Sequence, residues 1–190
     1  MLKSILILLF AAVNTGLMAV PVTNPEIPVF ISPSNKWIIV DKSGWKAPRI
    51  GVTIQSTDGT TLINESIRYS TRYNLKNVPD GTYLLQLEDD QKIRIQHLQV
   101  AHEMLYSTGI ITVYKPHLII NPDHVDMNLM TQGQSAEVSI LDADSKEVFS
   151  EKINDEVSVT RRYNVNQLPE GEYSFVVKIA DQLFTKSFNK

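Results

Sequence analysis

The segment RYNLKNVPDGTY at residues 72–83 recurs as RYNVNQLPEGEY at residues 162–173. Its arginine, first tyrosine, asparagine, proline, glycine and last tyrosine each return after the same spacing of 90 positions. Such regular spacing is typical of an internal repeat. The sequence therefore predicts two structurally similar copies in one chain.

The Pro-x-Gly step in each copy predicts a tight turn between two strands. Proline presets φ for a turn and glycine accepts a left-handed backbone, so we expect positive φ at Gly81 and Gly171. A tyrosine that follows such a corner can bury its ring and donate its hydroxyl back to the chain, as in the tyrosine corner of Ig-like sandwiches. We expect this structural role for Tyr83 and Tyr173.

Apolar residues alternate with polar ones on both sides of each turn. This period of two predicts strands with one buried face. After the turns, the residues predicted to be buried are Tyr83, Leu85, Leu87, Tyr173, Phe175, Val177 and Ile179. Before the turns they are Ile67, Tyr69, Tyr73, Leu75, Val157, Val159, Tyr163 and Val165.

Short strand patterns recur along the rest of the chain, with turn residues between them. This spacing is typical of an all-β sandwich, so we predict two tandem Ig-like antiparallel β-sandwich domains at residues 36–114 and 115–190. In this alignment His117–Ile120 answers Trp37–Val40, and Ala136–Leu141 answers Gly51–Gln55. The second copy is four residues longer between Val148 and Val157, which predicts an extended hairpin there.

The N-terminus has the pattern of a secretory signal peptide. A basic start at Lys3 precedes an apolar run over residues 5–13, and Ala19 offers a small residue for cleavage. The run is short for a bilayer span, although a retained anchor is the alternative. We predict a signal peptide at residues 1–19 and an extended proline-rich leader at residues 20–35, with no stable membrane span after cleavage.

Composition excludes several classes of function. The net charge of −3 shows no basic excess, which argues against nucleic acid as a partner. The chain has no cysteine, so disulfides, thiolate metal sites and cysteine nucleophiles are excluded. It also lacks a G-x-S-x-G nucleophile elbow and a phosphate-binding glycine loop.

A few side chains could carry chemistry. His124, Asp126 and Asn128 alternate along a strand pattern, so they share one face and could hold a divalent ion; a solvated strand face is the plainer interpretation. The acidic run of residues 88–90 is interpreted as a solvated turn. Trp45 lies in a loop predicted to be exposed, where it could stack on a sugar. We predict no catalytic, cofactor-binding or metal-binding residues, and hence no enzyme.

The second copy resembles a known family. The segments VSILDADSKEV at 138–148, YNV at 163–165 and LPEGEY at 168–173, with the end of the chain at 186–190, resemble the C-terminal sorting domains of the type IX secretion system of Bacteroidota. The chain is also similar to small secreted Ig-like proteins of unknown function from these bacteria. The resemblance extends over both copies. It implies a seven-stranded β-sandwich, export across the inner membrane and no catalysis.

Two functions follow as hypotheses. The first is an exported non-enzymatic binding or structural module, in the periplasm or on the surface of a Gram-negative bacterium, which recognises an envelope or extracellular protein or glycan through loops and strand edges. The second is a surface protein whose C-terminal repeat is a type IX sorting signal. No cofactor is implied by either.

Overall fold

The computed structural model describes residues 29–190, whose regular structure is almost entirely β-strand. Strands β1 to β15 are all paired antiparallel, and one 3-10 turn, η1 (Lys42–Gly44), stands among them. The predicted all-β class is confirmed. The predicted signal peptide and residues 20–28 of the leader lie outside the described residues. Within the described part of the chain, no helix is long and apolar enough to cross a bilayer.

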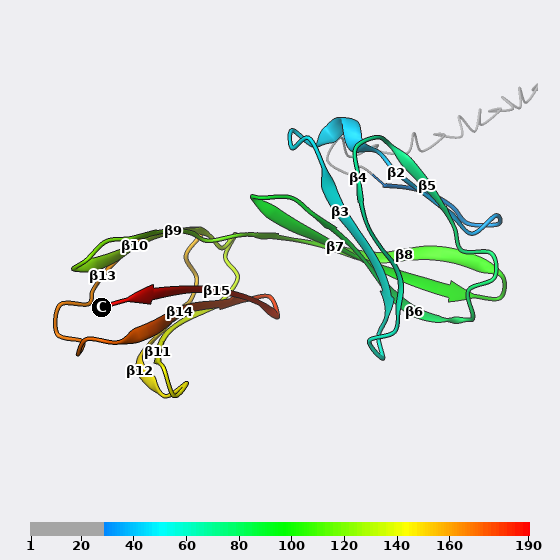
Figure 1. Ribbon diagram of the computed structural model, residues 1–190. Helices are drawn as coiled ribbons and strands as arrows, with labels where there is room; N and C mark the ends of the chain where they lie inside the picture. The colour runs from blue at the N-terminus through cyan, green and yellow to red at the C-terminus, as the bar shows by residue number, and fades with distance from the viewer. Residues whose placement is uncertain (1–28) are drawn as a thin grey trace, which may run out of the picture.

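The first unit comprises β1–β8 and contains two sheets (Figure 1). One sheet has the order β1-β2-β5. Its strands are β1 (Val29–Ser32), β2 (Trp37–Val40) and β5 (Thr71–Asn74). The other sheet has the order β4-β3-β6-β7-β8. Its strands are β3 (Ile50–Ser56), β4 (Thr61–Ile67), β6 (Gly81–Glu88), β7 (Lys92–Ala101) and β8 (Met104–Tyr114).

The second unit comprises β9–β15 and repeats this arrangement, with one strand fewer. The three-stranded sheet has the order β9-β10-β13. Its strands are β9 (His117–Ile120), β10 (His124–Met130) and β13 (Ser158–Asn164). The four-stranded sheet has the order β12-β11-β14-β15. Its strands are β11 (Ala136–Asp142), β12 (Glu147–Ile153), β14 (Glu172–Ile179) and β15 (Gln182–Asn189).

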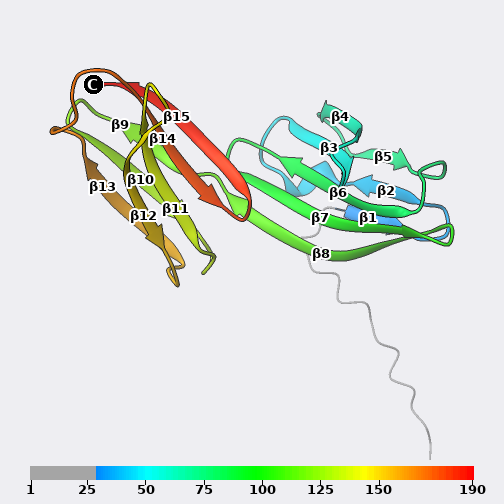
Figure 2. The ribbon, with the colours of Figure 1, turned by 90° about the horizontal axis from the view of Figure 1, so that it is seen from below.

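Each unit encloses its own cluster of buried side chains between its two sheets. The strands after each corner bury the predicted faces, with Leu85 and Phe175 fully buried at matching positions. The first cluster draws on Ile38 and Val40 from the three-stranded sheet, and the second on Val125 and Met127. Because each of these strands buries one face, the two sheets of a unit pack face to face around its cluster. Figure 2 shows the two units side by side, joined by the chain that leaves β8 and enters β9.

The predicted burial is wrong for two residues. Tyr69 is 80% exposed and Val157 is 67% exposed. Both lie where the chain leaves one sheet and enters the other, between β4 and β5 and between β12 and β13. The alternation of buried and exposed residues does not continue through these positions, because a crossover between sheets does not preserve the parity of a continuous strand.

The tyrosine corners are confirmed in both units. The Tyr83 hydroxyl donates to the Pro79 carbonyl at 2.9 Å, and the Tyr173 hydroxyl donates to the Pro169 carbonyl at 2.9 Å. Both rings are buried. The repeated tyrosines therefore fix the chain at the entry of β6 and β14 rather than offering a stacking surface to a ligand.

The turn itself lies earlier than predicted. The Val78 amide donates to the Leu75 carbonyl at 3.0 Å, and the Asn74 side chain accepts from the Lys76 amide at 2.9 Å. The second copy repeats both bonds, from the Leu168 amide to the Val165 carbonyl and from the Asn166 amide to the Asn164 side chain. The shared asparagine thus sets the turn by an Asx hydrogen bond, before the proline is reached.

The prediction of positive φ is wrong for Gly81, which has no positive φ and is the first residue of β6. Gly171 does have a positive φ, of 159°, which is close to extended backbone. A Cβ atom at Gly81 would lie 3.5 Å from the Tyr83 hydroxyl, which is an ordinary van der Waals contact. Since the preceding Asx turn reverses the chain, the glycine passes beside the tyrosine ring in extended conformation.

The sheet register also corrects the alignment of the copies. β2 and β10 are counterparts, because Ile38 pairs with Tyr73 while Val125 pairs with Tyr163. The predicted match of His117–Ile120 with Trp37–Val40 is therefore wrong, and His117–Ile120 is the counterpart of β1. β1 itself lies within the stretch predicted as an extended leader, where it forms an edge strand paired with β2.

The four extra residues of the second copy do not extend a hairpin. β4 and β12 have 7 residues each, whereas β5 has 4 and β13 has 7. The insertion therefore lengthens β13 and the crossover that precedes it. It enlarges the three-stranded sheet of the second unit, because β12 and β13 belong to different sheets.

β8 has 11 residues, and it has no counterpart in the second unit as described. It starts at Met104, after a turn with positive φ at His102 and Glu103. At its other end Val113 packs into the second cluster. Only Lys115 and Pro116 separate β8 from β9, and the Lys115 ammonium lies 2.6 Å from the Glu88 carboxylate.

Candidate functional site

The outer face of the sheet β1-β2-β5 presents apolar side chains to solvent. We define the first-unit face as Phe30, Trp37, Ile39 and Arg72. Phe30 is 56% exposed and Ile39 is 40% exposed. The register sets Phe30 beside Ile39 and Ile39 beside Arg72, so these three side chains form one row across the sheet. The pleat explains the placement, since Ile38 and Val40 point the other way into the core.

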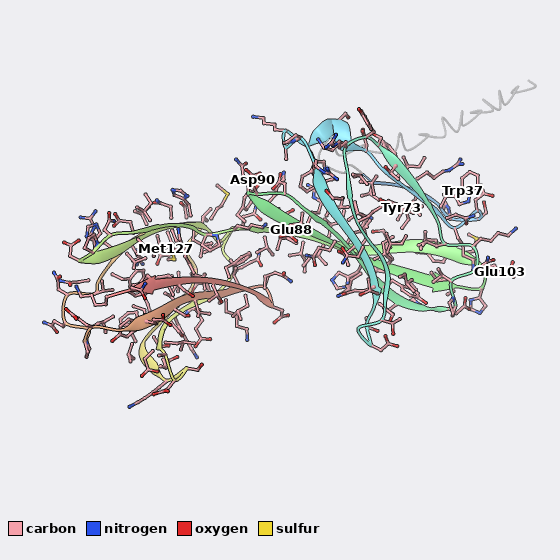
Figure 3. The ribbon with its side chains drawn as sticks, in the orientation of Figure 1. Trp37, Tyr73, Glu88, Asp90, Glu103 and Met127 are labelled. Atoms are coloured by element: carbon pink, nitrogen blue, oxygen red, sulfur yellow. The ribbon has the colours of Figure 1, made fainter. Side chains whose placement is uncertain are left out.

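Trp37 and Arg72 form a stacked pair on this face. The guanidinium carbon of Arg72 lies 4.1 Å from the centroid of the Trp37 ring, which is a cation–π geometry. Figure 3 places Trp37 at the end of the first unit that is remote from the second, whereas Glu88 and Asp90 lie at the near end. Within the described part of the chain, Trp37 therefore lies away from the second unit.

The matching face of the second unit is charged instead. Arg162, the counterpart of Arg72, holds Asp126 through two hydrogen bonds, from Nε to Oδ1 at 2.7 Å and from Nη2 to Oδ2 at 2.9 Å. The hydrogen bond from Arg162 lowers the pKa of Asp126. The His124 Nε2 atom lies 3.3 Å from the same carboxylate. Where the first unit has Ile39, the second therefore has a carboxylate with charged partners.

His124, Asp126 and Asn128 lie on the outer face of β10, while Val125, Met127 and Leu129 are buried. Each polar side chain has a partner within the protein. His124 Nδ1 contacts Asp123 at 2.5 Å, and Asn128 accepts from the Thr160 hydroxyl at 2.9 Å. Among the described residues, no group of three or more histidine or carboxylate side chains is placed to hold a metal ion. These side chains therefore form a network of ion pairs and hydrogen bonds on this face.

A groove of about 540 Å³ lies along the open side of the second unit, where β12 and β13 edge their two sheets. Phe149 and Tyr163 line it, and their rings meet edge-on at 5.6 Å. The Tyr163 hydroxyl donates to Glu151 at 2.8 Å, and burial raises the pKa of this tyrosine. The first unit repeats the pair, with the Tyr73 hydroxyl 2.7 Å from Glu65. The repetition indicates a structural role for this tyrosine–glutamate bond.

Trp45 is not exposed, which corrects the sugar-stacking hypothesis. It is 6% exposed and belongs to the first buried cluster, with the Lys92 ammonium 5.0 Å from its ring centroid. The sequence shows a polar loop around it, but the loop folds its one aromatic residue inward. The ring has no outer face free for a carbohydrate.

The remaining titratable side chains are scattered. His97 lies in β7, His102 in the turn before β8 and His117 at the start of β9. In the acidic turn, Asp89 accepts from the amides of Gln91 and Lys92, so it caps the reversal of the chain. These groups are not brought together.

Comparison with known families bears on the second unit. Residues 121–189 match the family described as the secretion system C-terminal sorting domain. The predicted resemblance is thereby confirmed for this part of the chain. The matched residues begin before β10 and end with β15, so the match leaves β1–β8 outside. The first unit has the same corner motif, but it lies outside the residues that match the family.

Solved structures give weak similarities over most of the chain. A biofilm-associated protein BSP domain is 12% identical, with a TM-score of 0.28, and the alignment covers 88% of this chain but 30% of that one. The chicken interferon gamma receptor alpha chain is 10% identical over 86% of this chain and 98% of that one, with a TM-score of 0.31. The chicken CNTN1 FN1–FN3 domains are 8% identical, with a TM-score of 0.29, and the alignment covers 86% of this chain and 66% of that one. No curated protein matches the chain.

The first-unit face was missed from the sequence. Phe30 stands between Pro28 and Pro33, and this proline spacing favoured a leader over a strand. The apolar run at residues 29–31 was the available sign, because proline is tolerated beside a short edge strand. The stacking of Trp37 on Arg72 depends on the pairing of β2 with β5, which no local pattern reveals.

Proposed function

We propose that this chain is an exported, non-enzymatic protein of two Ig-like domains, in which the second is a sorting tail and the first carries the binding surface. The first domain ends at Tyr114 and the second begins at Lys115. Residues 1–19 are the signal peptide that starts export across the inner membrane. The tail then directs the chain through a type IX secretion system to the cell surface.

The observation that carries the proposal is the family match at residues 121–189, because it falls on the second unit and leaves the first outside. That division follows the two buried clusters and the separate sheets of the described chain. The short connection through Lys115 and Pro116 gives a natural boundary. A tail that folds around its own core can be recognised, and removed, without unfolding the domain ahead of it.

Deleting residues 117–190 tests the sorting role. The shortened chain keeps Lys115 and its ion pair with Glu88. In a bacterium with a type IX system, we expect the intact chain at the cell surface or in the medium and the shortened chain in the periplasm. Both tryptophans lie in the first unit, so their fluorescence reports whether that unit remains folded. Surface delivery of the folded, shortened chain would contradict the proposal.

The binding role rests on the first-unit face. Aromatic residues and arginine are enriched at interface hot spots, and here an exposed phenylalanine, an exposed isoleucine and a tryptophan–arginine stack share one sheet face. The face suits an envelope or extracellular protein or glycan, since Trp37 and Phe30 supply apolar contact and Arg72 supplies hydrogen-bond donors.

Alanine substitution tests this face. We expect Phe30→Ala and Arg72→Ala each to weaken binding to isolated outer membranes or surface polysaccharide by about tenfold or more, as for hot-spot residues. Ile119→Ala is the matched control, because Ile119 is similarly exposed on the corresponding sheet of the second unit. Equal losses from all three variants, or no loss from the first two, would reject the face as the binding surface.

A further inference from the structure

The two units differ at one sheet edge. In the first unit, β7 is covered along its length by β8. Its counterpart β15 pairs with β14 on one side and ends the four-stranded sheet of the described chain on the other. The correspondence is residue for residue, because Tyr83 pairs with Leu98 in the first unit and Tyr173 pairs with Phe188 in the second.

The register identifies the backbone groups that face outward from β15. Gly171 and Lys190 exchange two hydrogen bonds, so they form a hydrogen-bonded pair. Antiparallel pairs alternate between hydrogen-bonded and non-hydrogen-bonded, so every second residue of β15 directs its N–H and C=O away from β14. These residues are Leu183, Thr185, Ser187 and Asn189.

The outward backbone edge of β15 is formed by residues without charged side chains. Its four outward residues are uncharged and exposed, with Leu183 at 65%. Lys186 lies between Thr185 and Ser187 in the sequence, and its ammonium donates to the Leu118 carbonyl at 2.9 Å. The pairing with β14 contains no bulge over 8 residues. Proteins usually block a long edge strand with charges, prolines or bulges.

Other edges of the described sheets are less suitable. β12 and β13 carry charged residues, among them Glu151 and Arg161, and β9 has only 4 residues. β8 is long and uncharged, but its edge is engaged at both ends: the Leu105 amide donates to Pro33, and the Thr112 carbonyl accepts from Gln134. Among these edges, β15 combines length with four uncharged residues at its outward positions.

We propose that β15 pairs antiparallel with β15 of a second copy of this chain, centred on Thr185. This register sets Thr185 opposite Thr185, Leu183 opposite Ser187 and Phe184 opposite Lys186, so no like charges meet. Centring on Lys186 would place two ammonium groups opposite each other, which is unfavourable. The two four-stranded sheets then become one continuous sheet about a two-fold axis.

The first unit supports this choice of occupant. The β7 counterparts of the outward residues are Ile93, Ile95, His97 and Gln99, and all four pair with uncharged residues of β8. A strand of uncharged residues thus already fills the equivalent edge within the chain. A second β15 likewise has uncharged residues at its outward positions, with backbone donors and acceptors at alternate residues.

Single cysteines test the register, because the natural chain has none. The protein is the chain from residue 20 onward, purified and mildly oxidised. Thr185→Cys should form a disulfide-linked dimer, since directly opposed residues lie within disulfide range. Leu183→Cys alone should not, because two copies of Leu183 would be about 14 Å apart along the strands. Mixing Leu183→Cys with Ser187→Cys should link the two. Val148→Cys, exposed on β12, is the control for random collision.

Sedimentation of the unlinked protein tests the backbone bonds. Thr185→Pro removes an outward N–H and spares the bonds to β14, so we expect the dimer to weaken about 10- to 100-fold, while Thr185→Val keeps its affinity. A chain that stays monomeric up to about 100 μM would overturn the proposal. So would a dimer that tolerates the proline, or cross-linking with no dependence on register. Both assays use purified protein, so their outcome is independent of secretion.

Discussion

The two units share a framework and differ on their surfaces. Both contain the Asx turn, the tyrosine–proline bond and the tyrosine–glutamate bond, each made by residues at matching positions. The three-stranded sheets then diverge on their outer faces. Ile39 stands beside Arg72 in one, and Asp126 binds Arg162 in the other. The repeat thus conserves what closes each core and varies what a partner would meet.

The units also differ in how their sheets end. β8 covers the edge of the first unit and continues into β9, and Lys115 ties the connection to Glu88. The second unit ends at β15 with its edge open in the described chain. The difference indicates that the edge of β7 is filled within the chain, whereas the matching edge of β15 is available for strand addition.

The largest expected effect comes from matched core truncations. Leu85 and Phe175 are counterparts and both are fully buried. We expect Leu85→Ala to destabilise the first unit by about 2–5 kcal/mol and Phe175→Ala to destabilise the second by about 3–5 kcal/mol. Because each unit has its own cluster, each loss should be confined to one unit.

Urea unfolding followed by two probes measures this separation. Tryptophan fluorescence reports the first unit, and hydrogen-exchange mass spectrometry reports both. A single transition that moves equally in both variants would show one cooperative structure rather than two. The contacts of Val113 with the second cluster make that outcome a real alternative to test.

A matched pair of glycines tests the corrected turn. Gly133 has φ +81° and Gly81 has no positive φ. Gly133→Ala should cost about 1–2 kcal/mol through left-handed strain, while Gly81→Ala should be neutral or stabilising by up to about 1 kcal/mol. Thermal unfolding of the two variants measures both values. A large loss from Gly81→Ala would restore the left-handed turn at Pro-x-Gly.

Much of the fold is readable from local patterns. Strand positions and buried faces follow from alternation, and both tyrosine corners follow from the motif around Tyr83 and Tyr173. The errors arise where pairing decides the structure. Tyr69 and Val157 sit at crossovers, and β1 is a strand because β2 supplies its partner. The first-unit face depends on three paired strands at once, so no single stretch of sequence reveals it.

Removing the corner hydroxyls should have a smaller effect, similar in both units. Tyr83→Phe and Tyr173→Phe each delete one hydrogen bond to a proline carbonyl and leave the ring packed. We expect a loss of about 0.5–1.5 kcal/mol in the unit that carries the change. Denaturant unfolding checks the values. A difference between the two variants much larger than this range would mean that the corners are not equivalent.

The smallest effect separates the outer faces by pH. The hydrogen bond from Arg162 lowers the pKa of Asp126, so the stabilisation by this pair is present above the ordinary pKa of an aspartate, about 3.9, and is lost as pH falls through the lowered value. The difference in stability between the natural chain and Arg162→Gln should therefore shrink below about pH 4. Arg72→Gln should show no such step, because Ile39 occupies the matching position. Acid titrations of both variants that coincide would contradict this assignment.

The mass of the exported protein tests the central claim most directly. Material recovered from the surface or medium of a bacterium with a type IX system is measured intact and mapped with peptides. If the second unit is a sorting tail, the recovered chain ends near Tyr114 and retains the whole first unit. Recovery of a chain that still ends at Lys190 and remains fully active in partner binding would contradict a removable tail and leave both units as parts of one binding module.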